Sequence, residues 1–163
     1  MNLFREKQLL RLEPTLLRVS DPAGAIGRLE TFLGDYAKAA SVRGVVLGMS
    51  GGLDSSVAAA LCARAFRDRN AVLGLCMPEA ETYNANNIQD AERVAKTFDI
   101  DFKIVDITSI IRGYSNLSVY DLKNKVANGN LKARVRASIL FYYSNILNRL
   151  VVGTTDKSEM MLG

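Results

Sequence analysis

Histidine is absent from the 163-residue sequence. Its absence excludes catalysis by a histidine acid or base, the serine–histidine–aspartate triad and histidine zinc ligands. The two cysteines, Cys62 and Cys76, do not form a CxxC pair, so we expect neither a disulfide framework nor a cysteine zinc site. We interpret both as buried thiols in a reducing cytoplasm. Any chemistry must therefore rest on phosphates, carboxylates, cations, hydroxyls and backbone groups.

Long hydrophobic runs are also absent. A membrane span needs about 20 consecutive apolar residues, and no run approaches that length. The first segment, MNLFREKQLLRLEP, carries charges throughout, so we do not interpret it as a signal peptide. The net charge of +4 is compatible with anionic small molecules but is too small and too scattered to indicate nucleic-acid binding. We therefore expect a cytoplasmic protein with no nucleic-acid or membrane partner.

Short apolar runs alternate with segments of helical periodicity along the chain. Strands are expected at 44–49, 71–78, 101–107 and 150–155, and helices at 22–40, 54–69, 86–98 and 131–148. This alternation predicts an α/β fold, a Rossmann-like parallel sheet flanked by helices on both faces. Length and composition fit a single domain at 21–163, preceded by an N-terminal extension or helix at 1–20.

The segment 113–130 interrupts this alternation. It is polar and rich in turn-forming residues, so we expect a long loop with a turn at Asn128-Gly129. A further helix is expected to begin at Asp156, just before the sequence stops at Gly163. We therefore expect that the C-terminal part of a larger domain is missing.

The sequence GMSGGLDSS, residues 48–56, lies between a predicted strand and a predicted helix. A helix N-terminus presents unpaired backbone N–H groups and the positive end of the helix dipole, which favour a bound phosphate. Glycines allow the backbone to approach phosphate oxygens closely, and Ser50, Ser55 and Ser56 add hydroxyl groups. The pattern is neither GxxxxGK[ST] nor GxGxxG. It predicts a phosphate cradle; the alternative is a tight turn in which Asp54 is a simple N-cap.

Asp54 carries a negative charge that a bare phosphate would repel. A divalent cation between the carboxylate and the phosphates removes this conflict. Magnesium held by a triphosphate and one or two carboxylates meets the requirement. The sequence therefore predicts Mg²⁺ at this loop, bound together with a triphosphate.

The loop SGGLDS resembles the pyrophosphate-binding loop of the PP-loop, or N-type, ATP pyrophosphatases, which split ATP into AMP and pyrophosphate while adenylating a substrate. Two further segments narrow the resemblance to one family, the ammonia-dependent NAD synthetases. NGNLKARVRASILFYYSNILNRLVVGTTDKSE is similar to a stretch of that family, and GLCMPEAETYNANNIQDAERVA resembles its second strand and following helix. The resemblance covers about Gly44 to Gly163 and none of the first 20 residues.

The resemblance implies where the ligands bind. ATP is expected to contact the glycine loop and the end of the fourth strand, at Gly48, Met49, Ser50, Gly51, Gly52, Leu53, Asp54, Ser55 and Thr154. Asp54 and Glu159 match the family's magnesium ligands. Arg134 matches a contact to the substrate deamido-NAD.

Three of these residues also have a plainer interpretation. Glu159 is then an ordinary first-turn glutamate stabilised by the helix dipole. Thr154 is a β-branched residue at a strand end. Arg134 is a solvated helical arginine, for which Lys132 and Arg136 provide neighbouring examples.

The resemblance implies the ATP-dependent amidation of deamido-NAD to NAD, with ammonia as the nitrogen source. The nicotinate carboxylate attacks the α-phosphorus of ATP, pyrophosphate leaves, and ammonia then attacks the acyl-adenylate and releases AMP. No protein nucleophile is required, in agreement with the absence of histidine. Two alternatives stay open: another PP-loop adenylating enzyme, such as a tRNA thiolation or GMP synthetase-like enzyme, and a nucleotide-binding module without catalysis.

The predicted helix at 131–148 is apolar around much of its circumference, with Phe141, Tyr142, Tyr143 and Ile146 among its residues. This is more apolar surface than one neighbouring element normally covers. In the family that the sequence resembles, the corresponding region contributes to a homodimer with the dinucleotide site near the interface. The resemblance therefore implies a homodimer; the alternative is a helix buried within one subunit.

Overall fold

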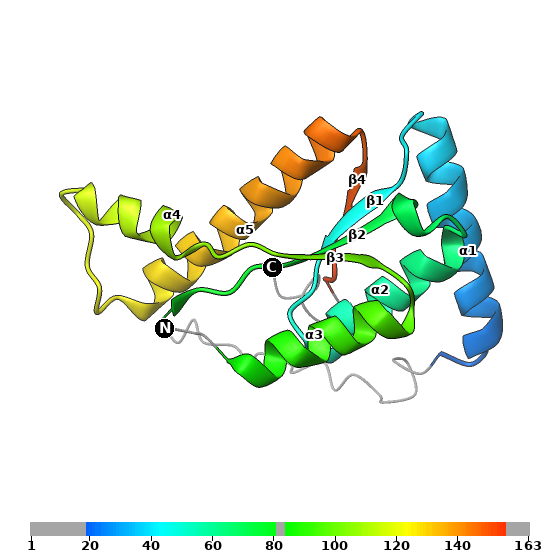
Figure 1. Ribbon diagram of the computed structural model, residues 1–163, viewed down its shortest axis with the longest axis horizontal. Coiled ribbons are helices and arrows are strands. Elements are labelled where there is room, and N and C mark those ends of the chain that lie inside the picture. Colours follow the sequence, from blue (N-terminus) through cyan, green and yellow to red (C-terminus); the bar gives the residue numbers. More distant parts are fainter. Residues whose placement is uncertain (1–18, 81–83, 156–163) are drawn as a thin grey trace, which may run out of the picture.

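The computed structural model describes residues 19–80 and 84–155 (Figure 1). The helix expected from Asp156 and the predicted metal ligand Glu159 lie outside these ranges, as does nearly all of the extension expected at 1–20. The elements, with η for a short 3₁₀ helix, are α1 (Pro22–Ala39), β1 (Val45–Gly48), α2 (Leu53–Ala65), η2 (Arg69–Ala71), β2 (Val72–Cys76), α3 (Ala85–Thr97), β3 (Asp101–Ile104), α4 (Thr108–Gly113), η4 (Tyr114–Asn116), α5 (Lys125–Leu147) and β4 (Leu150–Val152).

The described strands form one parallel sheet in the order β3-β2-β1-β4. β1 pairs with both neighbours, so that Val45 lies opposite Val72 of β2 and Leu150 of β4. Parallel strands that are covered on both faces contain continuous apolar runs rather than alternating ones. The runs VVL in β1 and VLGLC in β2 are buried throughout. The predicted α/β fold with a parallel sheet is confirmed.

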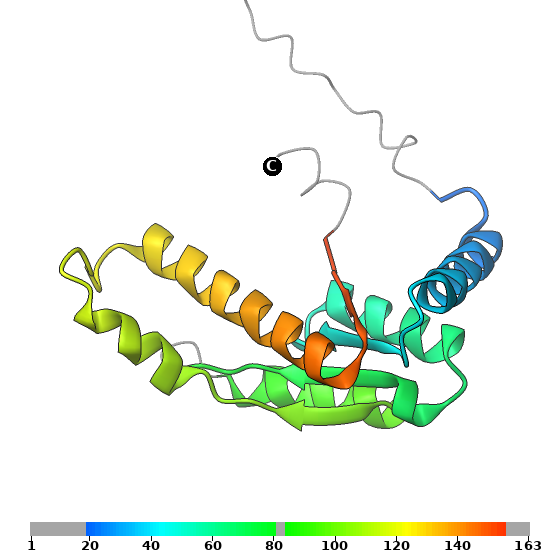
Figure 2. The ribbon, with the colours of Figure 1, turned by 90° about the horizontal axis from the view of Figure 1, so that it is seen from above.

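Helices cover both faces of this sheet (Figure 1 and Figure 2). Val45, Leu47 and Val72 pack into one apolar core with residues of α2 and α3. Val46 and Leu73 pack into a second core with residues of α4 and α5. Successive strand residues point to opposite faces, so β1 and β2 contribute to both cores. The prediction of helices on both faces is therefore confirmed.

The end expected for α2 at Arg69 is wrong. The helix ends at Ala65, and Phe66 adopts an extended conformation with φ −115°. Phe66 packs against the core formed by α2, α3 and the sheet. The Asp68 side chain then accepts a hydrogen bond of 2.9 Å from the Asn70 N–H and starts η2. The packing of the partly buried aromatic ring and the Asp68 cap therefore end the helix four residues earlier than the sequence pattern predicted.

The turn expected at Asn128-Gly129 is also wrong, because both residues lie inside α5. The Asn124 side chain caps this helix by accepting a hydrogen bond of 3.0 Å from the Ala127 N–H. Asn128 Nδ2 donates to the Asp121 carbonyl oxygen at 2.9 Å. Because the Asn124 cap starts the helix four residues before Asn128, the Asn-Gly pair adopts helical geometry instead of forming a turn.

α5 is not enclosed by the described part of the chain. On it, Phe141, Tyr142 and Ile146 are 58%, 67% and 68% exposed. α5 therefore packs on the sheet with one side, and its opposite side is apolar and exposed.

No helix within 19–80 and 84–155 is both long and apolar enough to cross a membrane.

Candidate functional site

The glycine loop joins the carboxyl end of β1 to the start of α2. The Met49 N–H donates to the Leu75 carbonyl oxygen at 2.9 Å, which ties the beginning of the loop to β2. Gly52 is the N-cap of α2, and no side chain caps the helix there. Helix geometry leaves the first N–H groups of α2 without an intrahelical acceptor. This open helix N-terminus lies at the sheet edge where parallel α/β folds bind ligands, as a phosphate cradle requires.

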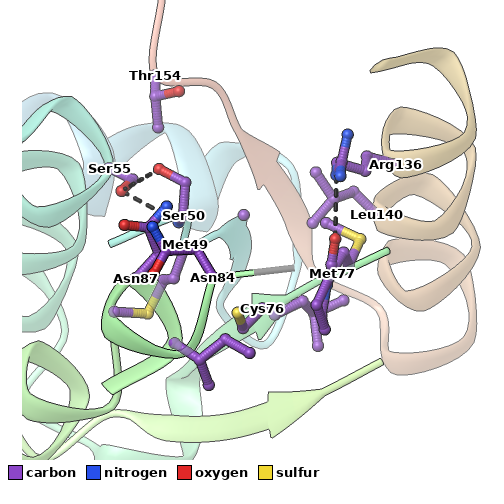
Figure 3. Close-up of a pocket in the computed structure, with 14 residues that line it drawn as sticks. Met49, Ser50, Ser55, Cys76, Met77, Asn84, Asn87, Arg136, Leu140 and Thr154 are labelled. Atoms are coloured by element: carbon purple, nitrogen blue, oxygen red, sulfur yellow. Dashed lines mark hydrogen bonds between the residues drawn. The ribbon is translucent and has the colours of Figure 1, made fainter. Parts of the chain in front are cut away.

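Ser55 holds the loop in shape. Its side chain is buried, and its Oγ donates to the Gly52 carbonyl oxygen at 3.0 Å while accepting a hydrogen bond of 3.2 Å from the Ser50 N–H. The hydroxyl oxygens of Ser50 and Ser55 lie 3.1 Å apart (Figure 3). Ser56 Oγ donates to the same Gly52 carbonyl at 2.8 Å. The hydroxyls predicted to add phosphate donors are thus already engaged in ordering the loop.

Gly51 is the loop position at which the backbone itself requires glycine. Its φ is +80°, a conformation that residues with a Cβ avoid. A Cβ at this position would lie 2.2 Å from the Asn87 carbonyl oxygen. The missing side chain lets the loop pack directly against the first turn of α3.

A cavity of about 470 Å³ opens beside the loop. The ends of β1, β2 and β4, the start of α3 and one face of α5 enclose it (Figure 3). Five of the residues predicted to bind ATP line this cavity: Gly48, Met49, Ser50, Ser55 and Thr154. Pockets of this volume accommodate small-molecule ligands and cofactors.

Asp54 lies on the other side of the loop. With Leu53 it lines a second cavity of about 410 Å³, formed by α1, α2 and the end of β4. Thr154 lines both cavities, so they meet at the end of β4. The sequence predicted one ATP site for these nine residues; in the structure seven of them line one or both of two adjoining cavities, and Gly51 and Gly52 line neither.

The structure places one of the two predicted magnesium ligands. Asp54 is exposed in the first turn of α2, whereas Glu159 lies outside the described residues and its role stays a prediction. In the described ranges, no group of three or more His, Cys, Asp or Glu side chains is placed to hold a metal ion. Magnesium commonly uses one or two carboxylates and completes its shell with phosphates and water. An exposed carboxylate beside an open helix N-terminus fits that donor set.

Arg134, the predicted contact to deamido-NAD, is exposed on α5 and does not line the 470 Å³ cavity. Its Nη1 donates to the Asn130 carbonyl oxygen at 3.2 Å. Arg136 does line the cavity, and its Nε donates to the Met77 carbonyl oxygen at 3.1 Å (Figure 3). The interpretation of Arg136 as solvated was therefore wrong. Arg136 lies four residues before Leu140, which also lines the cavity, so the two side chains share one face of α5. That spacing is the signal in the sequence that could have identified this face.

Both cysteines are buried and free, as predicted. Burial raises the pKa of the Cys62 thiol to about 12. Burial also raises the pKa of Cys76, and the Arg136 cation partly offsets that effect. Thiols with raised pKa values stay protonated at neutral pH and are poor nucleophiles. Sulfur chemistry at either residue is therefore disfavoured.

Comparison with known sequences gives a consistent result. A family model described as NAD synthase matches residues 25–163. The NH(3)-dependent NAD(+) synthetase of Methanocaldococcus jannaschii is 42% identical over 143 residues, which make up 85% of this chain and 53% of that protein. The protein of the same name from Pyrobaculum aerophilum is 43% identical over 136 residues, 83% of this chain and 50% of that protein. The chain thus spans about half the length of the curated relatives it matches.

Solved structures agree with these relatives. The NH3-dependent NAD synthetase from Campylobacter jejuni, in complex with the nitrate ion, superimposes with a TM-score of 0.79 at 37% identity over 86% of this chain and 59% of that chain. A glutamine-dependent NAD+ synthetase from Acinetobacter baumannii, in complex with ADP, has a TM-score of 0.78 at 29% identity over 85% of this chain and 26% of that chain. The described sheet and helices therefore have the arrangement found in these synthetases.

Proposed function

Because the chain belongs to the NAD synthase family, we propose that it carries the ATP-binding part of an ammonia-dependent NAD synthetase. The proposed reaction is the ATP-dependent amidation of deamido-NAD to NAD, with release of AMP and pyrophosphate. One observation carries the proposal: the uncapped N-terminus of α2 follows a glycine loop beside a cavity of about 470 Å³. Such a terminus stabilises the phosphates of a bound nucleotide through its N–H groups and dipole.

In the proposed complex, the N–H groups of the loop and of the first turn of α2 hold the pyrophosphate part of ATP. Two anions must meet when the nicotinate carboxylate attacks the α-phosphorus, so the site has to neutralise charge and align the reactants. Magnesium, held by Asp54 and Glu159, would supply part of that neutralisation. Arg136 contributes a cation at the cavity wall, and Arg134 contacts deamido-NAD from the exposed side of α5.

The reaction is tested by incubating the full chain with ATP, magnesium, ammonium and deamido-NAD, and measuring NAD and AMP by chromatography. We expect equal amounts of the two products, because each acyl-adenylate that reacts with ammonia releases one AMP. ATP binding without AMP release would instead support a nucleotide-binding module without catalysis.

In the same assay, a Cys62→Ser, Cys76→Ser double variant should keep its turnover, since both thiols are buried and protonated. Complete loss in a folded double variant would support a thiolation enzyme.

We further propose that the protein is a homodimer through the exposed side of α5. Phe141, Tyr142 and Ile146 form an apolar surface there, and an apolar cavity of about 400 Å³ that includes Ile110 and Tyr142 continues it towards α4. Exposed apolar patches of this kind mark protein–protein interfaces. Sedimentation velocity should give twice the chain mass, and Tyr142→Asp should shift the protein to the monomer. A wild-type monomer at all concentrations would exclude the dimer.

A further inference from the structure

A buried ion pair joins α5 to the segment that follows β2. Lys132 Nζ lies 2.8 Å from Glu79 Oε2, and the two side chains are 11% and 3% exposed. By contrast, the Lys96–Glu92 pair on α3 is 75% and 47% exposed. Surface pairs contribute little to a fold, whereas loss of one partner from a buried pair is strongly unfavourable. The Glu79–Lys132 pair therefore constrains the two elements that it joins.

A second contact between α5 and the same segment lies one helical turn further along. Arg136 Nε donates to the Met77 carbonyl oxygen at 3.1 Å. Lys132 and Arg136 are four residues apart, so their side chains lie on the same face of α5. Two directional contacts, at Met77 and at Glu79, thus fix the helix against the segment 77–80.

The segment 77–80 is held from its other side by the start of α4. The Ile107 N–H donates to the Pro78 carbonyl oxygen at 3.0 Å. The Ala80 N–H donates to Thr108 Oγ1, also at 3.0 Å. The segment is therefore tethered to fixed structure on both sides before the chain reaches α3.

Both sides of the contact with α5 line the 470 Å³ cavity. Met77 and Pro78 line it from the segment, and Arg136 and Leu140 line it from α5 (Figure 3). Glu79 and Lys132 do not line it. The ion pair thus lies next to the wall that these residues form, one helical turn of α5 away from Arg136.

We propose that Glu79 and Lys132 are a positioning pair that holds this cavity wall in place. Lys132 fixes the segment that leads from β2 to α3, and it keeps Arg136 and Leu140 opposite Met77. The assignment of the cavity to ATP rests on the proposed function, but the position of the wall does not. The pair acts on the site through the wall and not by contact with a ligand.

The position of the wall can be tested without a ligand, by measuring how fast each of the two cysteines reacts with iodoacetamide. Each cysteine reports on a different part of the protein. Cys76 lines the 470 Å³ cavity, whereas Cys62 lies on α2 and lines the adjoining cavity of about 410 Å³, and both are buried. In Lys132→Met and in Glu79→Gln, iodoacetamide at pH 8 should label Cys76 about tenfold faster than in the wild type, since local opening exposes the wall. The rate at Cys62, measured by peptide mass spectrometry in the same samples, should be unchanged.

Three variants complete the design. Lys96→Met removes a cation from an exposed pair and should leave both labelling rates unchanged. Lys132→Arg keeps the positive charge and should restore slow labelling of Cys76. Glu79→Gln should perturb folding less than Lys132→Met, because the charge that it leaves, on Lys132, lies nearer to solvent than Glu79 does. It serves as the test variant if Lys132→Met does not fold. Unchanged labelling of Cys76, or equal acceleration at both cysteines, would overturn the proposal.

ATP titration then separates this inference from the proposed function. If the wall positions a nucleotide site, Lys132→Met should weaken ATP binding about tenfold, and Lys132→Arg should recover it. A wild-type protein that does not bind ATP would count against the proposed function. The Cys76 labelling result would still decide whether the pair holds the wall.

Discussion

Replacing Asp54 with asparagine should lower magnesium-dependent formation of NAD and AMP by about a thousandfold or more. Asp54 is the described carboxylate in the first turn of α2, beside the open helix N-terminus. An asparagine keeps the size of the side chain but removes the charge that a magnesium ion bound to ATP requires. The ATP dissociation constant should also become insensitive to magnesium, whereas in the wild type magnesium should strengthen binding.

Asp90→Asn is the matched control for this experiment. Asp90 is a half-exposed carboxylate on α3, where it accepts a hydrogen bond of 3.1 Å from Arg93 Nη1. Its loss should change neither turnover nor the effect of magnesium, because a surface pair contributes little. Unchanged turnover in Asp54→Asn would contradict the proposed role of Asp54 as a magnesium ligand. Equal losses in the two variants would indicate a general effect of charge.

The fold could be read from the sequence because its main elements have unambiguous patterns. The runs in β1 and β2 are short, apolar and bounded by turn-forming residues, and buried parallel strands need no polar alternation. α1 begins at a cap that the sequence displays, since Asp21 accepts from the Gly24 N–H at 2.9 Å. The two errors have different causes. At Phe66 a tertiary contact with the core accompanies an earlier helix end than the sequence predicted, and at Asn128 the cap at Asn124 placed the predicted turn inside a helix.

The conformation of the glycine loop could be predicted for a different reason. A strand end, a glycine bend and a helix start are consecutive in the sequence, so the geometry of the loop is local. Sequence reasoning could not separate Asp54 from the cavity that Ser55 lines, because adjacent residues at a helix start point in different directions.

The wall of the cavity could not be predicted, because it depends on residues that are distant in the chain. Lys132 and Arg136 look like solvated cations when only their own helix is considered. Their partners, Glu79 and the Met77 carbonyl, lie in the connection after β2. Helical periodicity identifies residues that share a face, but it does not say which face meets the sheet. Only the packing of α5 on the sheet distinguishes Arg136 from Arg134.

Gly51→Ala should destabilise the protein by about 2 kcal/mol or more and weaken ATP binding. Two costs add at this position, because the backbone has a φ of +80° and the new Cβ would lie 2.2 Å from the Asn87 carbonyl oxygen. The contact is with backbone, which cannot rotate away as a flexible side chain can. The loop or the first turn of α3 must therefore shift, and both border the proposed nucleotide site. Urea denaturation and ATP titration measure the two effects.

Gly129→Ala is the matched control, since it makes the same chemical change in a different backbone environment. Gly129 lies inside α5, and a Cβ there meets nothing within 4 Å. Alanine is favoured over glycine in a helix interior, so this variant should be more stable than the wild type by up to about 1 kcal/mol, with unchanged ATP binding. The two substitutions should therefore move the urea midpoint in opposite directions. A Gly51→Ala variant as stable as the wild type would mean that the loop does not have the conformation on which the phosphate cradle depends.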